Sequence, residues 1–317
     1  MARLLPVTCI SYNVMSMVQA GRWQDVDREF AQYGIVALQG TRDRLVEACE
    51  QHQTEHFRWH RWKYGRGGCS NRACGVAIGL NKKMYSRESV KQVYPVPAKY
   101  AGRVGILRIK EKKGLDLLVV TLYLPVEGRS GHCEDLLRWL EKLLRAAPQR
   151  TLPIICGDMN AHIGDGGPLT RVEARRSDCP FQCIGPHAIA RENGNGALLR
   201  TFLERVGYVA ANSFYNSDPT YYSGDGNSFS HIDMFLLPWD VLKRISCCKT
   251  LTTLGDRVQL ARTAGRVDHR PILVKLWHRT FFDDDEQHRK MQFGMDKVRQ
   301  RSRSFQAEST RTGSGSS

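Results

Sequence analysis

Short runs of apolar and β-branched residues recur along most of this chain, and they constrain its fold more than any other feature. Each run has the length of a strand rather than a helix, and Gly, Pro, Asp or Asn residues follow many of them. The runs lie at residues 7–12, 35–39, 75–80, 104–109, 115–123, 152–156, 232–237 and 271–277. This pattern predicts a β-rich domain whose strands are mostly buried.

Amphipathic helices are fewer. One apolar stripe at helical spacing consists of Leu136, Leu137, Leu140, Leu143 and Leu144. A second helix is predicted at 197–206, after the Gly-rich "RENGNG", and two more at 25–32 and 42–51. Many strands with occasional helices indicate an α+β fold, in which two sheets form a β-sandwich flanked by helices in four layers, α/β/β/α.

The periodic pattern ends near Arg279. Beyond it come an acidic cluster, a segment with helical character, and a polar end rich in Ser, Gly and Arg. We therefore expect one folded domain over residues 1–278 and a polar, partly disordered tail over residues 279–317.

The apolar runs and the cysteines bear on the compartment. No run approaches the roughly eighteen apolar residues of a membrane span, and the N-terminus lacks a secretory signal pattern. The ten cysteines do not follow the spacing of paired zinc ligands. These features predict an intracellular protein, nuclear or cytoplasmic and not secreted, with reduced thiols and no membrane partner. They indicate no protein partner.

The charge balance is strongly basic. There are 47 Lys and Arg residues against 32 Asp and Glu, giving a net charge of +15 at pH 7. A globular domain this basic often binds a polyanion, and nucleic acid is the usual one. Charge that serves only solubility is the alternative.

Polar residues lie where several predicted strands begin or end. Asp158 and Asn160 directly follow the run at 152–156, and two residues apart on an extended chain they would share a face. The other residues at strand boundaries are Asn13, Tyr123, Asp233, Asp268 and His269. Each alone is explained by a turn, a cap or the core. Together, in a basic chain, they indicate one site.

The order of these motifs resembles the endonuclease/exonuclease/phosphatase superfamily. The motifs are an Asn near the start, Tyr before Pro, "GDMN", Ile-Asp on a strand, and "DHRP" before the last strand. The resemblance covers roughly residues 5–278, including "GRVGILRI". The stretch at 195–237 looks most like the endonuclease domain of non-long-terminal-repeat retrotransposons. The resemblance implies metal-dependent hydrolysis of phosphodiesters in DNA, with the tail as the start of a linker.

The resemblance also implies roles for the site residues. Asp233 would orient His269, which would act as general base or as a donor to the phosphate. Asp158 would orient the nucleophile or protonate the leaving oxygen, and Tyr123 would donate to the phosphate. Asn160 and Asn13 would hold phosphate or metal-bound water. Asn13 and Asp268 would lie at a Mg²⁺ or Mn²⁺ site, whose oxygen ligands suit these ions.

One position departs from the family pattern. Where the family has Leu-Gln-Glu-Thr, with the Glu as main metal ligand, this chain has "LQGTR" and Gly40. Met15 stands where some members have Asp, and Asp43 lies three residues after Gly40. We therefore expect weakened metal binding. Two alternatives stay open: a catalytically inactive nucleic-acid-binding module of the same fold, and a phosphatase or deadenylase of the same superfamily.

Overall fold

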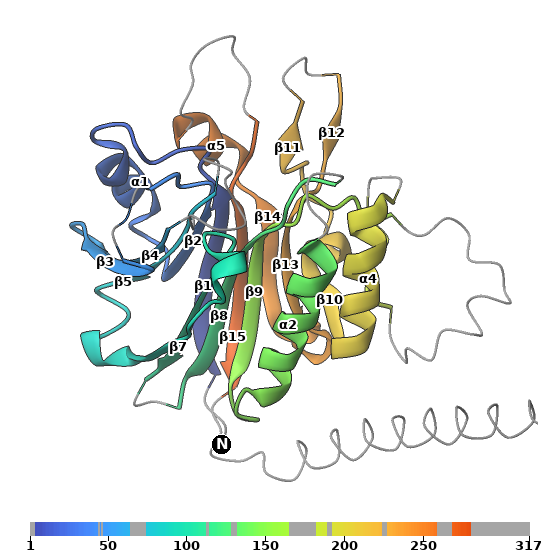
Figure 1. Ribbon diagram of the computed structural model, residues 1–317, viewed down its shortest axis with the longest axis horizontal. Coiled ribbons are helices and arrows are strands. Elements are labelled where there is room, and N and C mark those ends of the chain that lie inside the picture. The colour runs from blue at the N-terminus through green and yellow to red at the C-terminus, as the bar shows by residue number, and fades with distance from the viewer. Residues whose placement is uncertain are drawn as a thin grey trace, which may run out of the picture. The chain divides into compact units, whose positions relative to one another are not determined.

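A computed structural model gives the arrangement of the strands and helices (Figure 1). It describes residues 4–43, 45, 47–63, 74–111, 114–127, 132–164, 182–188, 192–223, 227–258 and 268–279. Residues Leu5–His278 form one compact unit. The predicted tail lies outside the described residues, apart from Arg279.

The first sheet has seven strands. In spatial order they are β14 (Ile245–Thr250), β15 (Ile272–Arg279), β1 (Leu4–Asn13), β2 (Ile35–Gln39), β5 (Val76–Asn81), β4 (Phe57–Trp62) and β3 (Cys49–Gln53). The pair β1 and β2 is parallel, whereas β2, β5, β4 and β3 pair antiparallel.

The second sheet has six strands. They are β10 (Tyr208–Ala210), β13 (Asp233–Pro238), β9 (Leu152–Asp158), β8 (Asp116–Tyr123), β7 (Val104–Lys110) and β6 (Val90–Val93). Here β8 and β9 are the parallel pair. A separate short hairpin joins β11 (Tyr221–Tyr222) to β12 (Phe229–Ser230).

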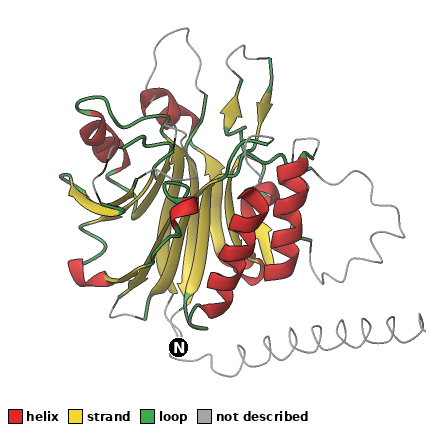
Figure 2. Cartoon of the chain, viewed as in Figure 1, coloured by secondary structure: helices red, strands yellow, loops and turns green. Residues whose placement is uncertain are grey.

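Helices cover the outer faces of both sheets (Figure 2). Helices α2 (His132–Ala146) and α4 (Gly194–Val206) pack on the second sheet, and α1 (Arg22–Phe30) and α5 (Thr252–Val258) pack on the first. Short 3₁₀ turns lie at η1 (Arg87–Ser89), η2 (Ala98–Tyr100), η3 (Ala211–Phe214) and η4 (Trp239–Arg244). A third apolar cluster fills the space between the sheets. The predicted four-layer α/β/β/α fold is confirmed.

The boundaries follow local chemistry. Helix α4 begins at an Asn193 cap, whose side chain accepts a hydrogen bond from Gly196 N, and it ends at Gly207 in the left-handed conformation. The prediction of a helix at 42–51 is wrong. Arg42 has a φ of 59°, and residues 49–53 form the edge strand β3 on β4. Pairing with the sheet overrides the helical pattern there.

A buried polar contact joins the two sheets below one end of the sandwich. Gln39 Nε2 of β2 donates to Thr121 Oγ1 of β8 at 2.9 Å and to Ser11 Oγ of β1 at 3.2 Å. All three side chains are fully buried. Because a buried amide without partners is costly, these bonds favour one alignment of the sheets.

Two further expectations can be compared with the described part of the chain. The eight cysteines within it are free thiols, while Cys69 and Cys179 lie outside it. None of its helices is long and apolar enough to cross a membrane.

Candidate active site

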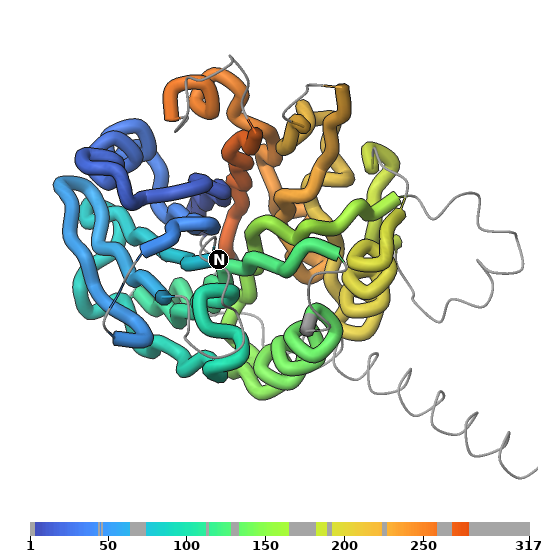
Figure 3. The backbone as a smooth tube through the Cα atoms, turned by 45° about the horizontal axis from the view of Figure 1, so that its top comes forward, coloured from blue at the N-terminus to red at the C-terminus, as the bar shows by residue number. Residues whose placement is uncertain are grey.

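The two parallel strand pairs bring polar residues to one end of the sandwich. In the second sheet Tyr123 lies opposite Asp158, and Asp158 lies opposite Asp233 at the start of β13. In the first sheet β1 ends at Asn13, beside Gln39 of β2. Figure 3 tilts this end toward the viewer, with the red β15 segment running between the blue and orange parts of the chain.

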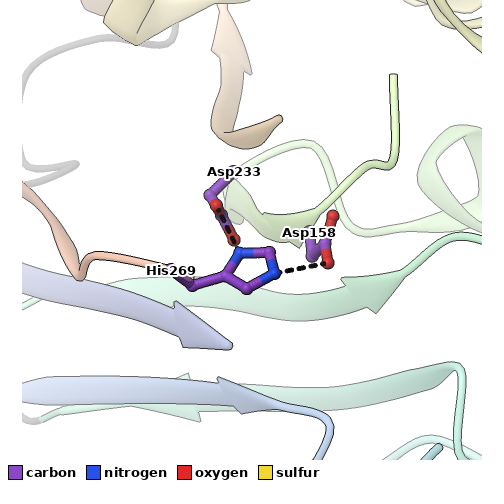
Figure 4. Close-up of side chains that lie close together, drawn as sticks. All are labelled: Asp158, Asp233 and His269. Atoms are coloured by element: carbon purple, nitrogen blue, oxygen red, sulfur yellow. Dashed lines mark hydrogen bonds and ion pairs between the residues drawn. The ribbon is translucent and has the colours of Figure 1, made fainter. Parts of the chain in front are cut away.

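His269 lies between two carboxylates (Figure 4). Its Nδ1 is 3.0 Å from Asp233 Oδ2, and its Nε2 is 3.8 Å from Asp158 Oδ2. Asp233 is fully buried, and Asp158 and His269 nearly so. The predicted pairing of Asp233 with His269 is therefore present in the structure, with Asp158 on the other side of the ring.

The charges of this group depend on one another. Burial lowers the pKa of His269. The nearby carboxylates of Asp233, Asp158 and Asp268 raise it by more, so that the net pKa is about 9. Burial and the neighbouring Asp233 raise the pKa of Asp158 to about 6, although the charge of His269 and the hydrogen bonds from Asn160 and Asn13 lower it. The imidazole ring is therefore charged at neutral pH, and Asp158 can gain or lose a proton near neutral pH.

Asn13 connects the two sheets within the site. Its Nδ2 donates to Asp158 Oδ2 at 2.9 Å and lies 3.3 Å from His269 Nε2. In the neutral ring Nε2 accepts from this amide; in the charged ring it donates toward Asp158 instead. Asn13 Oδ1 accepts from Met15 N at 3.0 Å. His269 thus has a defined partner in each of its protonation states.

Tyr123 is half-buried and keeps its proton. Burial and the charge of Asp158 raise the pKa of Tyr123 to about 12, while Arg103 and Asn13 oppose the shift. The Arg103 guanidinium lies 5.0 Å from the centre of the Tyr123 ring and donates to the carbonyls of Tyr123 and Leu124. The Tyr123 hydroxyl is therefore a neutral donor with a fixed cation behind its ring.

The chain turns directly after Asp158. Asn160 has a φ of 42°, and its backbone N donates to Asp158 Oδ1 at 2.9 Å. Its side chain donates to Leu124 O, and Asn195 of α4 donates to the carbonyls of Asn160 and Pro125. The premise of an extended chain is wrong here. Asn160 fixes Asp158 through its backbone instead of sharing a face with it.

Asp268 and the hairpin complete the neighbourhood of His269. Asp268 is half-buried, and its charge raises the pKa of His269 less than Asp233 or Asp158 does. Tyr221 of β11 forms a backbone bridge with His269, and their ring centres are 5.0 Å apart. Tyr221 therefore covers one side of the imidazole.

Gly40 stands where the sequence resemblance implies a glutamate metal ligand, and the structure leaves no room there for a side chain. Gly40 has a φ of 65°, and a Cβ atom there would lie 2.6 Å from Asn13 Oδ1. Asp43 does not replace that ligand: its carboxylate lies 3.7 Å from Arg61 Nη1 of β4, and burial raises its pKa to about 6. The end of β2 therefore does not fit a divalent cation, because it offers no carboxylate.

A different set of donors does fit one. Ligand atoms of Asp158, Asp233 and His269 all lie within 4.8 Å of one another. The buried Asp233 Oδ1 has no hydrogen-bond partner among the described residues. Two carboxylates with a neutral imidazole can bind a divalent cation. The ring must lose its second proton first, so such binding would compete with the charged form of His269.

Comparisons with known proteins give the fold. No protein-family model matches the chain, and no curated protein matches it significantly. An apurinic/apyrimidinic endonuclease from Leishmania major matches with a TM-score of 0.57 at 14% identity, over 86% of this chain and 88% of that one. The endonuclease domain of TRAS1, a telomere-specific non-LTR retrotransposon, matches with a TM-score of 0.51 at 15% identity, over 86% of this chain and 98% of that one.

A third solved structure, the 3′ phosphatase NExo from Neisseria bound to a product DNA hairpin, matches with a TM-score of 0.53 at 15% identity, over 85% of this chain and 99% of that one. The chain therefore has the endonuclease/exonuclease/phosphatase fold. These neighbours include nucleases and a phosphatase, and the retrotransposon domain is one among several.

Arg103, Asn195 and Tyr221 lie at the site but were not expected there from the sequence. Arg103 stands in "GRVGILRI" and Asn195 in "RENGNG", which were singled out for other reasons. Only the pairing of β7 with β8 and the packing of α4 bring them to the site. Tyr221 carries no local signal beyond its place before "SGDG".

Proposed function

We propose that this protein hydrolyses phosphodiester bonds in DNA. The observation that carries the proposal is His269 held between Asp233 and Asp158, with Asn13 and Tyr123 at the same strand ends. Phosphodiester hydrolysis needs donors to the phosphoryl oxygens and a group that exchanges protons with water or the leaving oxygen. Tyr123 and the charged His269 are the donors, and Asp158 is the proton-exchanging group.

We propose Mg²⁺ or Mn²⁺ as the cofactor, held at Asp233 Oδ1, which has no hydrogen-bond partner among the described residues, so that Asp158 stays able to exchange a proton. Bound there, the ion would stabilise negative charge on the phosphoryl oxygens. Affinity should be low, because Gly40 supplies no carboxylate and His269 carries a competing charge. The metal-binding roles that the sequence resemblance implies for Asn13 and Asp268 stay predictions.

Nucleic acid is the favoured substrate class for two reasons. The chain carries a net charge of +15. The β11–β12 hairpin, whose Tyr221 covers His269, also bears a 55% exposed Phe229, 6.3 Å from the ring of Tyr222. Exposed aromatic rings beside basic groups stack on bases. A small phosphate ester has no bases to stack on these rings. The hairpin therefore favours DNA over a small phosphate ester as the substrate.

A retrotransposon-type endonuclease domain is the narrower form of this proposal. It rests on the sequence resemblance at 195–237 and on the similarity to the TRAS1 domain. Gly40 favours the competing function, a nucleic-acid-binding module without catalysis.

Nicking of supercoiled plasmid with Mg²⁺, Mn²⁺ or EDTA tests the proposal. The native protein and a His278→Gln control should nick with a divalent cation, and EDTA should stop it. His269→Gln and Asp158→Ala should lower the rate roughly 10²- to 10⁴-fold. A folded native protein that binds DNA and never nicks would identify the inactive binding module. Phosphate release from 3′-phosphorylated DNA without nicking would identify a phosphatase.

A further inference from the structure

The segment that carries His269 presents a second basic residue on its opposite side. Arg270 follows His269 directly, and successive side chains of an extended strand point to opposite faces. Tyr221 pairs with His269, while Tyr222 N donates to Asp268 O and Arg270 N donates to Thr220 O. The short ladder therefore has a His269–Tyr221 side and an Arg270–Tyr222 side.

The Arg270 side chain is held by neutral groups. Its guanidinium lies 4.4 Å from the centre of the Tyr222 ring, and Nη1 donates to Tyr222 Oη at 3.1 Å. Nη1 also contacts Thr252 Oγ1 of α5 at 3.4 Å. Stacking and these bonds fix the plane of the guanidinium before any ligand arrives.

Within the described ranges, the positive charge of Arg270 has no direct counter-charge. Among the described residues no carboxylate lies within 4.0 Å of it. The link to Asp218 is indirect, through the Thr252 hydroxyl, which contacts Asp218 Oδ2 at 2.8 Å. The buried Nε of Arg270 has no hydrogen-bond partner there either. An oriented, half-buried guanidinium without a carboxylate is suited to an anion.

We infer that Arg270, stacked on Tyr222, binds a DNA phosphate next to the scissile one. This inference rests on the proposed function and assigns a DNA contact to a residue that the catalytic group does not use. Because His269 and Arg270 are adjacent but face opposite ways, the two would contact different phosphates of one strand. A phosphate contact adds affinity without sequence preference.

The salt dependence of DNA binding tests this inference. Affinity for a duplex of about 20 base pairs is measured by fluorescence anisotropy over a NaCl series, in EDTA so that no cleavage occurs. Arg270→Met keeps an unbranched apolar stem but removes the guanidinium and its charge, and Arg270→Lys keeps the charge. The matched control is Arg244→Met, because Arg244 is ion-paired with Asp240 at 3.3 Å. Arg270→Gln repeats the test if the Met variant does not fold.

Loss of one phosphate contact should lower the slope of log K against log [NaCl] by about 0.9. Arg270→Met should show this loss, and Arg270→Lys and Arg244→Met should keep the native slope. An unchanged slope for a folded Arg270→Met, or an equal loss for Arg244→Met, would overturn the inference and leave the proposed function standing. A native protein whose DNA binding is insensitive to salt would overturn both.

Discussion

The same strands carry two clusters of Asp and His at opposite ends of the sandwich. Strand β8 begins at Asp116 and ends at Tyr123, β9 follows Thr151 and ends at Asp158, and β15 follows His269 and includes His278. At the far end Asp116 accepts two bonds from Arg108, at 3.0 and 2.8 Å, and one from Thr151. That carboxylate is fully compensated.

The two histidines show the contrast. Burial and the charge of Arg244 lower the pKa of His278 to about 4, so it is neutral at pH 7. His269 has neighbouring carboxylates instead and is charged. The far end thus satisfies its charges internally, as a structural cluster does. The site end holds two buried carboxylates around one cation, and one Asp233 oxygen has no hydrogen-bond partner in the part of the chain that the structure describes. A substrate or ion can complete this arrangement.

The same substitution at both ends should separate the two kinds of cluster. Asp116→Asn should lower the free energy of unfolding by about 2–3 kcal/mol, because Arg108 loses its charged partner. Asp158→Asn should change it by less than about 1 kcal/mol or raise it, because repulsion with Asp233 is relieved. Urea unfolding at pH 7 measures both. Equal losses would mean that the site end is as well compensated as the far end.

The pH dependence of stability should differ in sign between the two histidines. The folded pKa of His269 lies above its ordinary value, so its contribution is present below about pH 6.5 and is lost toward pH 9. The folded pKa of His278 lies below its ordinary value, so stability is lost as pH falls from about 6.5 toward 4. In a plot of Tm against pH, His269→Gln should flatten the slope on the alkaline side, and His278→Gln should flatten it on the acid side. Identical profiles for the two variants would contradict the assignment.

The smallest effect concerns Gly40. Gly40→Ala should cost about 1–2 kcal/mol for a left-handed residue, plus the displacement of Asn13 Oδ1. Gly21 has a φ of 79° and open space around its Cβ position, so Gly21→Ala measures the conformational cost alone. Gly40→Glu should therefore not restore metal binding by itself. A Gly40→Glu protein that is as stable as the native one and binds Mn²⁺ more tightly would contradict this prediction. It would show that the Asn13 side chain moves aside at little cost.

Much of the fold and part of the site could be predicted from the sequence. Buried strands such as β2 read clearly because every residue in them is apolar or paired inside the core. Edge strands such as β3, with "CEQHQ", could not be predicted, since only pairing with β4 makes them strands. Likewise, Asn13 and Asp158 could be singled out by their strand ends, but the contact between them comes from two sheets meeting.

The contact between Gln39 and Thr121 has a consequence for how activity can be lost. Asn13 lies two residues beyond Ser11 and Tyr123 two residues beyond Thr121, so the bonds that join the sheets also set the spacing between the halves of the site. Hydrocarbon side chains of similar volume at these three positions could leave the protein as stable or more so. The sheets would then be free to settle at another offset. Inactivation in this protein can therefore arise with every residue of the site in place.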